Sequence, residues 1–147
     1  MKSTTIAALS LLLAIGSAMA DDPIHGLQSK QDFITMKAQV TKDFAGGDKY
    51  KEIAPDDQKT VLTALDRMDG RWQHANAAGQ LDPTDEAAQA TDQEVVTGIL
   101  THASAESRVV CERYMPTNSH LAKTVCETVA QKRRDAQNAK DVMKQGD

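Results

Sequence analysis

The sequence predicts a mostly α-helical small domain of three to four helices with one disulfide-stapled β-hairpin near its C-terminus. Three observations predict this fold: apolar residues at helical spacing behind helix-capping residues, two short β-prone segments around a cluster of turn formers, and one cysteine in each of those segments. The 147 residues, with 17 Lys+Arg and 21 Asp+Glu, suit one domain. Large apolar residues are few, so we expect a thin core.

The first twenty residues have the pattern of a signal peptide. Lys2 supplies a positive start, residues 6–15 are apolar, and Ala18 and Ala20 flank Met19 as a peptidase requires, so cleavage is expected before Asp21. The alternative, a membrane anchor, needs an apolar run about twice as long. We therefore expect one domain over 21–147, with no membrane span after cleavage, in the periplasm or outside the cell, where thiols are oxidised.

Two helices are expected before residue 80. Ser29 and Asp32 match a capping box, and Gly46 and Gly47 end the apolar stripe that follows. That stripe consists of Phe33, Met36, Val40 and Phe44. The second helix is predicted to begin at Pro55, a residue that suits the first helical position, and to end at Gly79. Its stripe consists of Val61, Leu62, Leu65, Met68 and Trp72.

Two further helices follow. Asp82 is the predicted N-cap of the third, which runs through Ala88, Val95, Val96, Ile99 and Leu100. Its carboxylates, Asp92 included, are interpreted as a solvent-facing acidic half. Thr128 caps a fourth helix that continues towards Met143, carries the basic residues 132–134 as a solvated face, and is expected to dock only loosely because its apolar side is small.

A β-hairpin is expected at about 108–127, between the third and fourth helices. Residues 116–120 are turn formers, and a turn centred between Asn118 and Ser119 places Cys111 opposite Cys126. Their spacing fits neither a redox motif nor a zinc site, so a structural disulfide is the preferred interpretation. Closing such a loop contributes about 3 kcal/mol, and its removal is expected to lower the melting temperature.

The region from Leu100 to Arg134 resembles a group of small exported proteins of Gram-negative bacteria. The residues that carry the resemblance are Leu100-Thr101, Ser107-Arg108, Val110-Cys111, Pro116-Thr117-Asn118-Ser119 and Cys126-Glu127-Thr128-Val129. The resemblance implies a secreted helical domain that ends in a hairpin with paired cysteines. The resemblance implies no activity, so no catalytic residue can be assigned to this chain from it. Asn118 stands where that group has Gly, and Asn tolerates the positive φ that such a turn needs.

The sequence offers no catalytic motif. It has no G-x-S-x-G elbow, no Gly-rich phosphate loop and no H-E-x-x-H. His102 and Glu106 are four residues apart, but two ligands without a third are better explained as an exposed pair than as a metal site. We therefore predict no catalytic residues, no metal and no cofactor. The net charge of −4 and the expected compartment argue against a nucleic-acid partner.

These observations favour an exported, non-enzymatic interaction or accessory protein with a protein partner in the cell envelope. The candidate binding surface is the hairpin tip, formed by Arg113, Tyr114, Met115, Asn118 and His120. The alternative for Tyr114 and Met115 is that they fold back over the helices. Alternative functions are an envelope inhibitor or immunity-type protein, a small hydrolase with dispersed catalytic residues, and a stress-related helper. The sequence does not define the oligomeric state.

Overall fold

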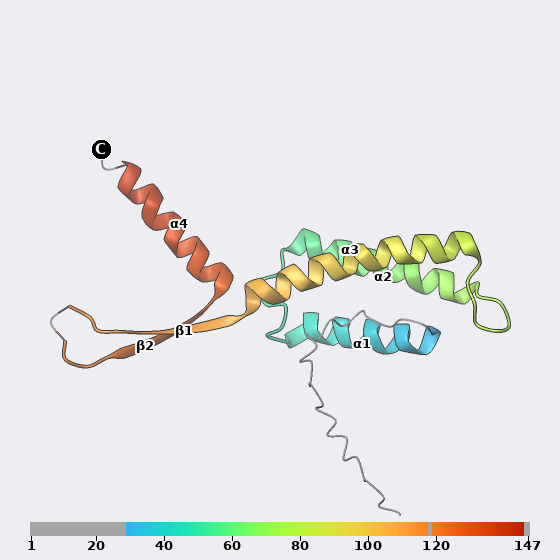
Figure 1. Ribbon diagram of the computed structural model, residues 1–147, viewed down its shortest axis with the longest axis horizontal. Helices are drawn as coiled ribbons and strands as arrows, with labels where there is room; N and C mark the ends of the chain where they lie inside the picture. The colour runs from blue at the N-terminus through green and yellow to red at the C-terminus, as the bar shows by residue number, and fades with distance from the viewer. Residues whose placement is uncertain (1–28, 118, 146–147) are drawn as a thin grey trace, which may run out of the picture.

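The computed structural model describes residues 29–117 and 119–145, and this part of the chain has the predicted fold class. The expected signal peptide, residues 1–20, and Asn118 lie outside the described residues. Along the chain come the helices α1 (Lys30–Gly46), α2 (Pro55–Gln73) and α3 (Pro83–Ser107), then the strands β1 (Val109–Tyr114) and β2 (Lys123–Thr128), and finally helix α4 (Val129–Gln145). The first three helices lie side by side as a bundle, and the hairpin and α4 leave the end of α3 in different directions (Figure 1).

The core of the bundle is formed by the predicted apolar stripes. Phe33 on α1, Leu65 and Met68 on α2, and Val96 and Leu100 on α3 are almost completely buried, and Trp72 is 6% exposed. Phe44 and Ile99 pack against this cluster from its edge. Leu62 and Val95 were expected in the stripes but are exposed, because the buried face of each helix is narrower than the sequence pattern suggested.

The capping residues determine where two of the helices begin. The Ser29 side chain accepts a hydrogen bond from the Asp32 N–H, and Asp82 accepts from the N–H groups of Thr84 and Asp85. These contacts satisfy backbone donors that have no partner inside a helix. Helix α2 instead begins at Pro55, which follows Ala54, a residue without a side-chain cap.

Helix α2 ends at Gln73, so the prediction that it would extend to Gly79 was wrong. The loop after it is organised by Asn76, whose Oδ1 accepts hydrogen bonds from the N–H groups of Ala78 (2.9 Å) and Gln80 (3.0 Å). Gly79 donates to the Asn76 carbonyl and has a φ of 74°, which places its left-handed conformation inside this loop. The Asn76 side chain competes with the helix for these backbone groups, and the helix stops earlier.

The contact between α2 and α3 includes an ion cluster centred on the buried residue Asp92. This residue is 5% exposed, so the expectation that it faces solvent was wrong. Arg67 donates to both carboxylate oxygens of Asp92, and Arg71 donates to Oδ2 at 2.7 Å. The two arginines are one helical turn apart on α2, so both reach the same carboxylate. Their hydrogen bonds, led by that of Arg67, hold the pKa of Asp92 below its ordinary value.

The hairpin has the predicted register. Cys111 pairs with Cys126, and the pairing runs from Val109 opposite Thr128 to Tyr114 opposite Lys123. Helix α4 follows without a loop, and the Thr128 hydroxyl accepts from the Gln131 N–H as predicted for its N-cap. Ala130 is the buried residue of α4. No helix in the described ranges is long and apolar enough to cross a membrane.

Candidate functional site

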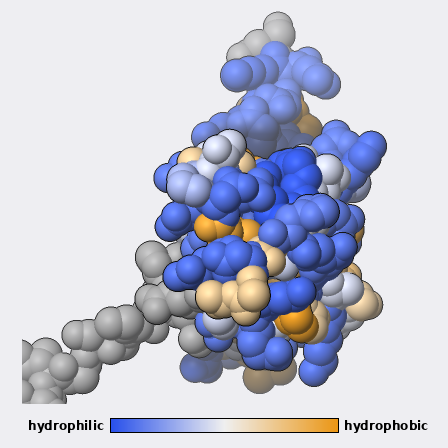
Figure 2. Space-filling view, turned by 90° about the vertical axis from the view of Figure 1, so that its right-hand side faces the viewer, coloured by the Kyte–Doolittle hydropathy of each residue, from blue (hydrophilic) through white to orange (hydrophobic). Residues whose placement is uncertain are grey.

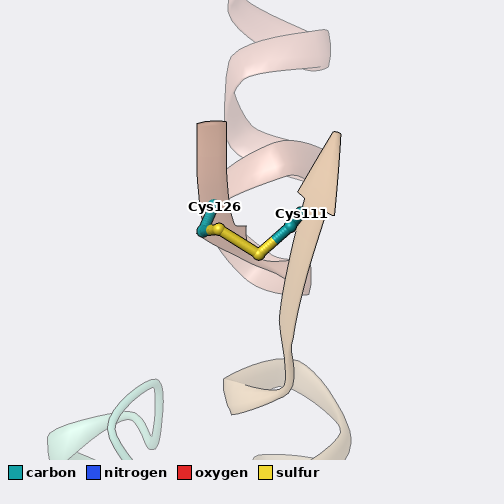
Figure 3. Close-up of a disulfide and its surroundings, with 2 residues drawn as sticks. All are labelled: Cys111 and Cys126. Atoms are coloured by element: carbon teal, nitrogen blue, oxygen red, sulfur yellow. A yellow bond between two sulfur atoms is a disulfide. The ribbon is translucent and has the colours of Figure 1, made fainter. Parts of the chain in front are cut away.

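The candidate site is a projecting arm, which we define as the hairpin (109–128) together with α4. The disulfide joins Cys111 to Cys126 directly across the two strands, with a Cα–Cα distance of 4.0 Å (Figure 3). Both cysteines are exposed. The hairpin extends away from the bundle, and the disulfide therefore links its strands without the support of a core (Figure 1).

The hairpin tip carries most of the residues predicted to bind a partner. Tyr114 is 48% and Met115 66% exposed, so these side chains do not fold back over the helices. Arg113 and His120 are exposed on the same projecting element. The tip has a hydrogen-bonded turn in which the Ser119 N–H donates to the Pro116 carbonyl at 3.0 Å. The arrangement gives an exposed tip on a covalently closed stem.

Exposed apolar side chains are concentrated on the arm. Of the ten large hydrophobic residues that are exposed in the described part of the chain, seven belong to the hairpin or to α4. These are Val109, Tyr114, Met115, Leu121, Val125, Val142 and Met143. The end of the molecule seen in Figure 2 is instead mainly hydrophilic, with small separate apolar areas. Exposed apolar groups gathered on one element are typical of a contact surface.

The base of the arm is attached to the bundle by a polar cluster around Glu52, in the loop before α2. Glu52 accepts hydrogen bonds from the Thr128 hydroxyl (2.7 Å) and from Arg134 (2.9 Å), and its own N–H donates to the Ser107 hydroxyl (2.9 Å). The hydrogen bond from Arg134, followed by that from Thr128, keeps the pKa of Glu52 below its ordinary value. The start of α4 is thereby fixed to the loop between α1 and α2.

The basic residues 132–134 complete this attachment. Lys132 forms an ion pair with Glu112 of the hairpin, and Arg133 bonds Glu106 of α3 at 2.8 Å. The prediction of a simple solvated face was incomplete, because these half-exposed side chains also bridge α4 to three different segments. Sequence reasoning missed the cluster, since its acidic partners are 20 to 82 residues away along the chain.

The other chemical candidates are dispersed. His102 lies 4.0 Å from Glu106, whose carboxylate is already bonded by Arg133. Within the described residues, no group of three or more His, Cys, Asp or Glu side chains is placed to hold a metal ion. A hollow of about 620 Å³ beside the loop between α2 and α3 is lined by Trp72, Gln89 and one carboxylate, Glu86, but by no histidine.

Comparison with protein-family models, with curated proteins and with solved structures gives no match for this chain.

Proposed function

We propose that this chain is an exported, non-enzymatic binding protein that contacts a protein partner in the cell envelope through its hairpin tip. The observation that supports the proposal most directly is the concentration of exposed apolar residues on the arm, with Tyr114 and Met115 beside a stapled turn. Tyr and Arg are common in binding hot spots, and a stem closed by a disulfide loses less conformational freedom on docking. The disulfide also suits a non-reducing compartment.

A specific inhibitor or immunity-type protein is the second candidate. The observation that favours it is the narrow projection of the hairpin from the bundle, a shape that can enter a cleft in a partner (Figure 1). Resemblance to small exported proteins of Gram-negative bacteria, carried by the segment from Leu100 to Arg134, agrees with either candidate, because it implies secretion and no particular activity.

The test is capture of partners from an envelope extract by the disulfide-bonded protein, with two matched double variants. Tyr114→Ala/Met115→Ala removes the apolar groups of the tip, whereas Val142→Ala/Met143→Ala removes another exposed apolar pair, at the end of α4. We expect the tip variant to weaken capture about 30-fold, as for the loss of a hot spot, and the α4 variant to bind normally. Both melting temperatures should stay within about 1 °C of wild type, because these side chains are exposed.

Two results would contradict this proposal. Normal capture by the tip variant would place the binding surface elsewhere. A large fall in its melting temperature would mean that Tyr114 and Met115 stabilise the fold. Export is tested separately by the intact mass of the protein recovered from the envelope fraction, which should begin at Asp21.

A further inference from the structure

The outer edge of β2 has backbone groups available for another strand. The Val129 N–H donates to the Arg108 carbonyl at 3.0 Å, so the backbone N–H at residue 129 points towards the β1 side of the hairpin. Hydrogen-bonding direction alternates along an antiparallel strand, so the N–H and C=O groups of Thr124 and Cys126 point outward. The described sheet has only β1 and β2, and residues 123–126 are exposed. An edge of this kind is a template for strand addition.

We propose that the strand that pairs with this edge is β2 of a second copy of this chain, antiparallel, with Val125 opposite Val125 of the other copy. A two-fold axis perpendicular to the sheet relates two such strands. In an antiparallel pair, side chains that face each other lie on the same side of the sheet. With this two-fold axis, that is possible only when the axis passes beside one residue, which then faces the same residue of the other copy. The result is a symmetric dimer that contains one four-stranded intermolecular sheet and adds no further copies.

Charge complementarity supports this register. With Val125 at the centre, Lys123 of each copy lies opposite Glu127 of the other, and the apolar central pair is flanked on both sides by opposite charges. Shifting the centre to Thr124 places Val125 opposite Lys123, and shifting it to Cys126 places Val125 opposite Glu127. Each shift loses both charge pairs and sets an apolar side chain against a charge.

The outer edge of β1 lacks this self-complementarity. Pairing β1 with its own copy about Cys111 sets Val110 against Glu112 and Val109 against Arg113, and pairing about Glu112 sets Glu112 against Glu112. Like charges directly opposite one another are destabilising. A lysine on an edge strand ordinarily discourages pairing, but at β2 the two-fold supplies each Lys123 with a carboxylate.

The stability of the hairpin gives a physical reason for pairing. An isolated two-stranded hairpin is marginal in water, whereas a wider sheet is independently stable. Here the hairpin projects from the bundle, and Val125 is 45% exposed. Pairing through β2 covers this side chain and leaves Tyr114 and Met115, which lie on the β1 side of the hairpin, outside the new seam. The inference therefore does not depend on the proposed partner of the tip.

Charge exchange at the two pairing positions is the direct test, read by sedimentation of the disulfide-bonded protein over a wide range of concentrations. We expect wild type to form dimers, and Glu127→Lys or Lys123→Glu to weaken the dimer at least about tenfold, because each variant sets like charges opposite one another twice. The double variant Lys123→Glu/Glu127→Lys should restore the dimer, since it exchanges the two charges.

Backbone variants provide a second, independent test. Thr124→Pro removes an outward N–H and should abolish the dimer while the disulfide and the helical circular dichroism persist. A wild-type protein that is monomeric at every concentration would overturn the proposal. So would a dimer that survives Thr124→Pro, or a double charge variant that fails to recover. Open-ended assemblies would also overturn it, because they would indicate β1 pairing with β2 of the next molecule.

Discussion

Removing the disulfide should loosen the hairpin and leave the bundle almost unchanged. The perturbation is Cys111→Ser/Cys126→Ser, which opens a loop with a sequence separation of 15 between its ends. Loop-closure entropy assigns about 3 kcal/mol to this cross-link. The sequence led us to expect a marked fall in melting temperature, but the structure places the whole loop on an arm that projects from the bundle (Figure 1). The free energy should therefore be lost from the hairpin alone.

The two expectations differ enough to measure. If the cross-link stabilised the cooperative unit, about 3 kcal/mol would lower the melting temperature by about 11 °C for a domain of this size. If it stabilises the hairpin alone, the helical signal should melt within about 2 °C of wild type. Amide hydrogen exchange in residues 109–128 should then become about 100-fold faster, the equivalent of the same free energy, while exchange in α2 stays unchanged.

The assay is thermal circular dichroism combined with hydrogen exchange resolved by peptide, on wild type and on the double serine variant. Wild type that has been reduced and alkylated is the matched control, because it opens the same loop without a substitution. A fall of more than about 6 °C in the helical melt would refute the reasoning, since it would show that the hairpin and the bundle unfold together.

Further predictions concern the charged clusters. Asp92→Asn should cost about 3 kcal/mol in unfolding free energy, measured by urea denaturation, because it leaves Arg67 and Arg71 without their buried carboxylate. Asp66→Asn, at an exposed ion pair with Lys37, should cost less than about 1 kcal/mol. Equal losses in the two variants would contradict the distinction between a buried and an exposed carboxylate. The pKa of Asp92 is lower in the folded than in the unfolded state, so the stability from this cluster is present above about pH 4 and is lost as the pH falls through the lowered value. Acid unfolding followed by fluorescence should therefore show a smaller loss of stability in Asp92→Asn, and an unchanged acid dependence would count against the ionised cluster.

Local signals were enough to predict most of the elements. Ser29, Asp82 and Thr128 act within one turn of the helices that they cap, so their effect can be predicted without the fold. The register of the hairpin is similarly local, because the turn centre sets which residues face each other, Cys111 and Cys126 among them.

The features that the sequence did not reveal depend on contacts between distant segments. Asp92 is buried because α2 presents two arginines to it, and the acidic sequence of α3 gives no signal of that contact. The attachment of Arg134 to Glu52 joins residues 82 positions apart. At the candidate site, residue types predicted the tip, but only the direction in which the hairpin leaves α3 distinguishes an exposed Tyr114 from a core residue.

The chain enters and leaves the hairpin at the same place. Arg108 and Val129 are joined by a backbone hydrogen bond, so the twenty residues between them form an insert whose ends already meet. Lengthening, shortening or exchanging the part of this insert beyond Glu112 and Val125 leaves the path of the chain through α3 and α4 unaltered, because Thr128 still caps α4 and bonds Glu52 at the junction. The outer part of the hairpin can therefore change in length and sequence while its helical support stays constant.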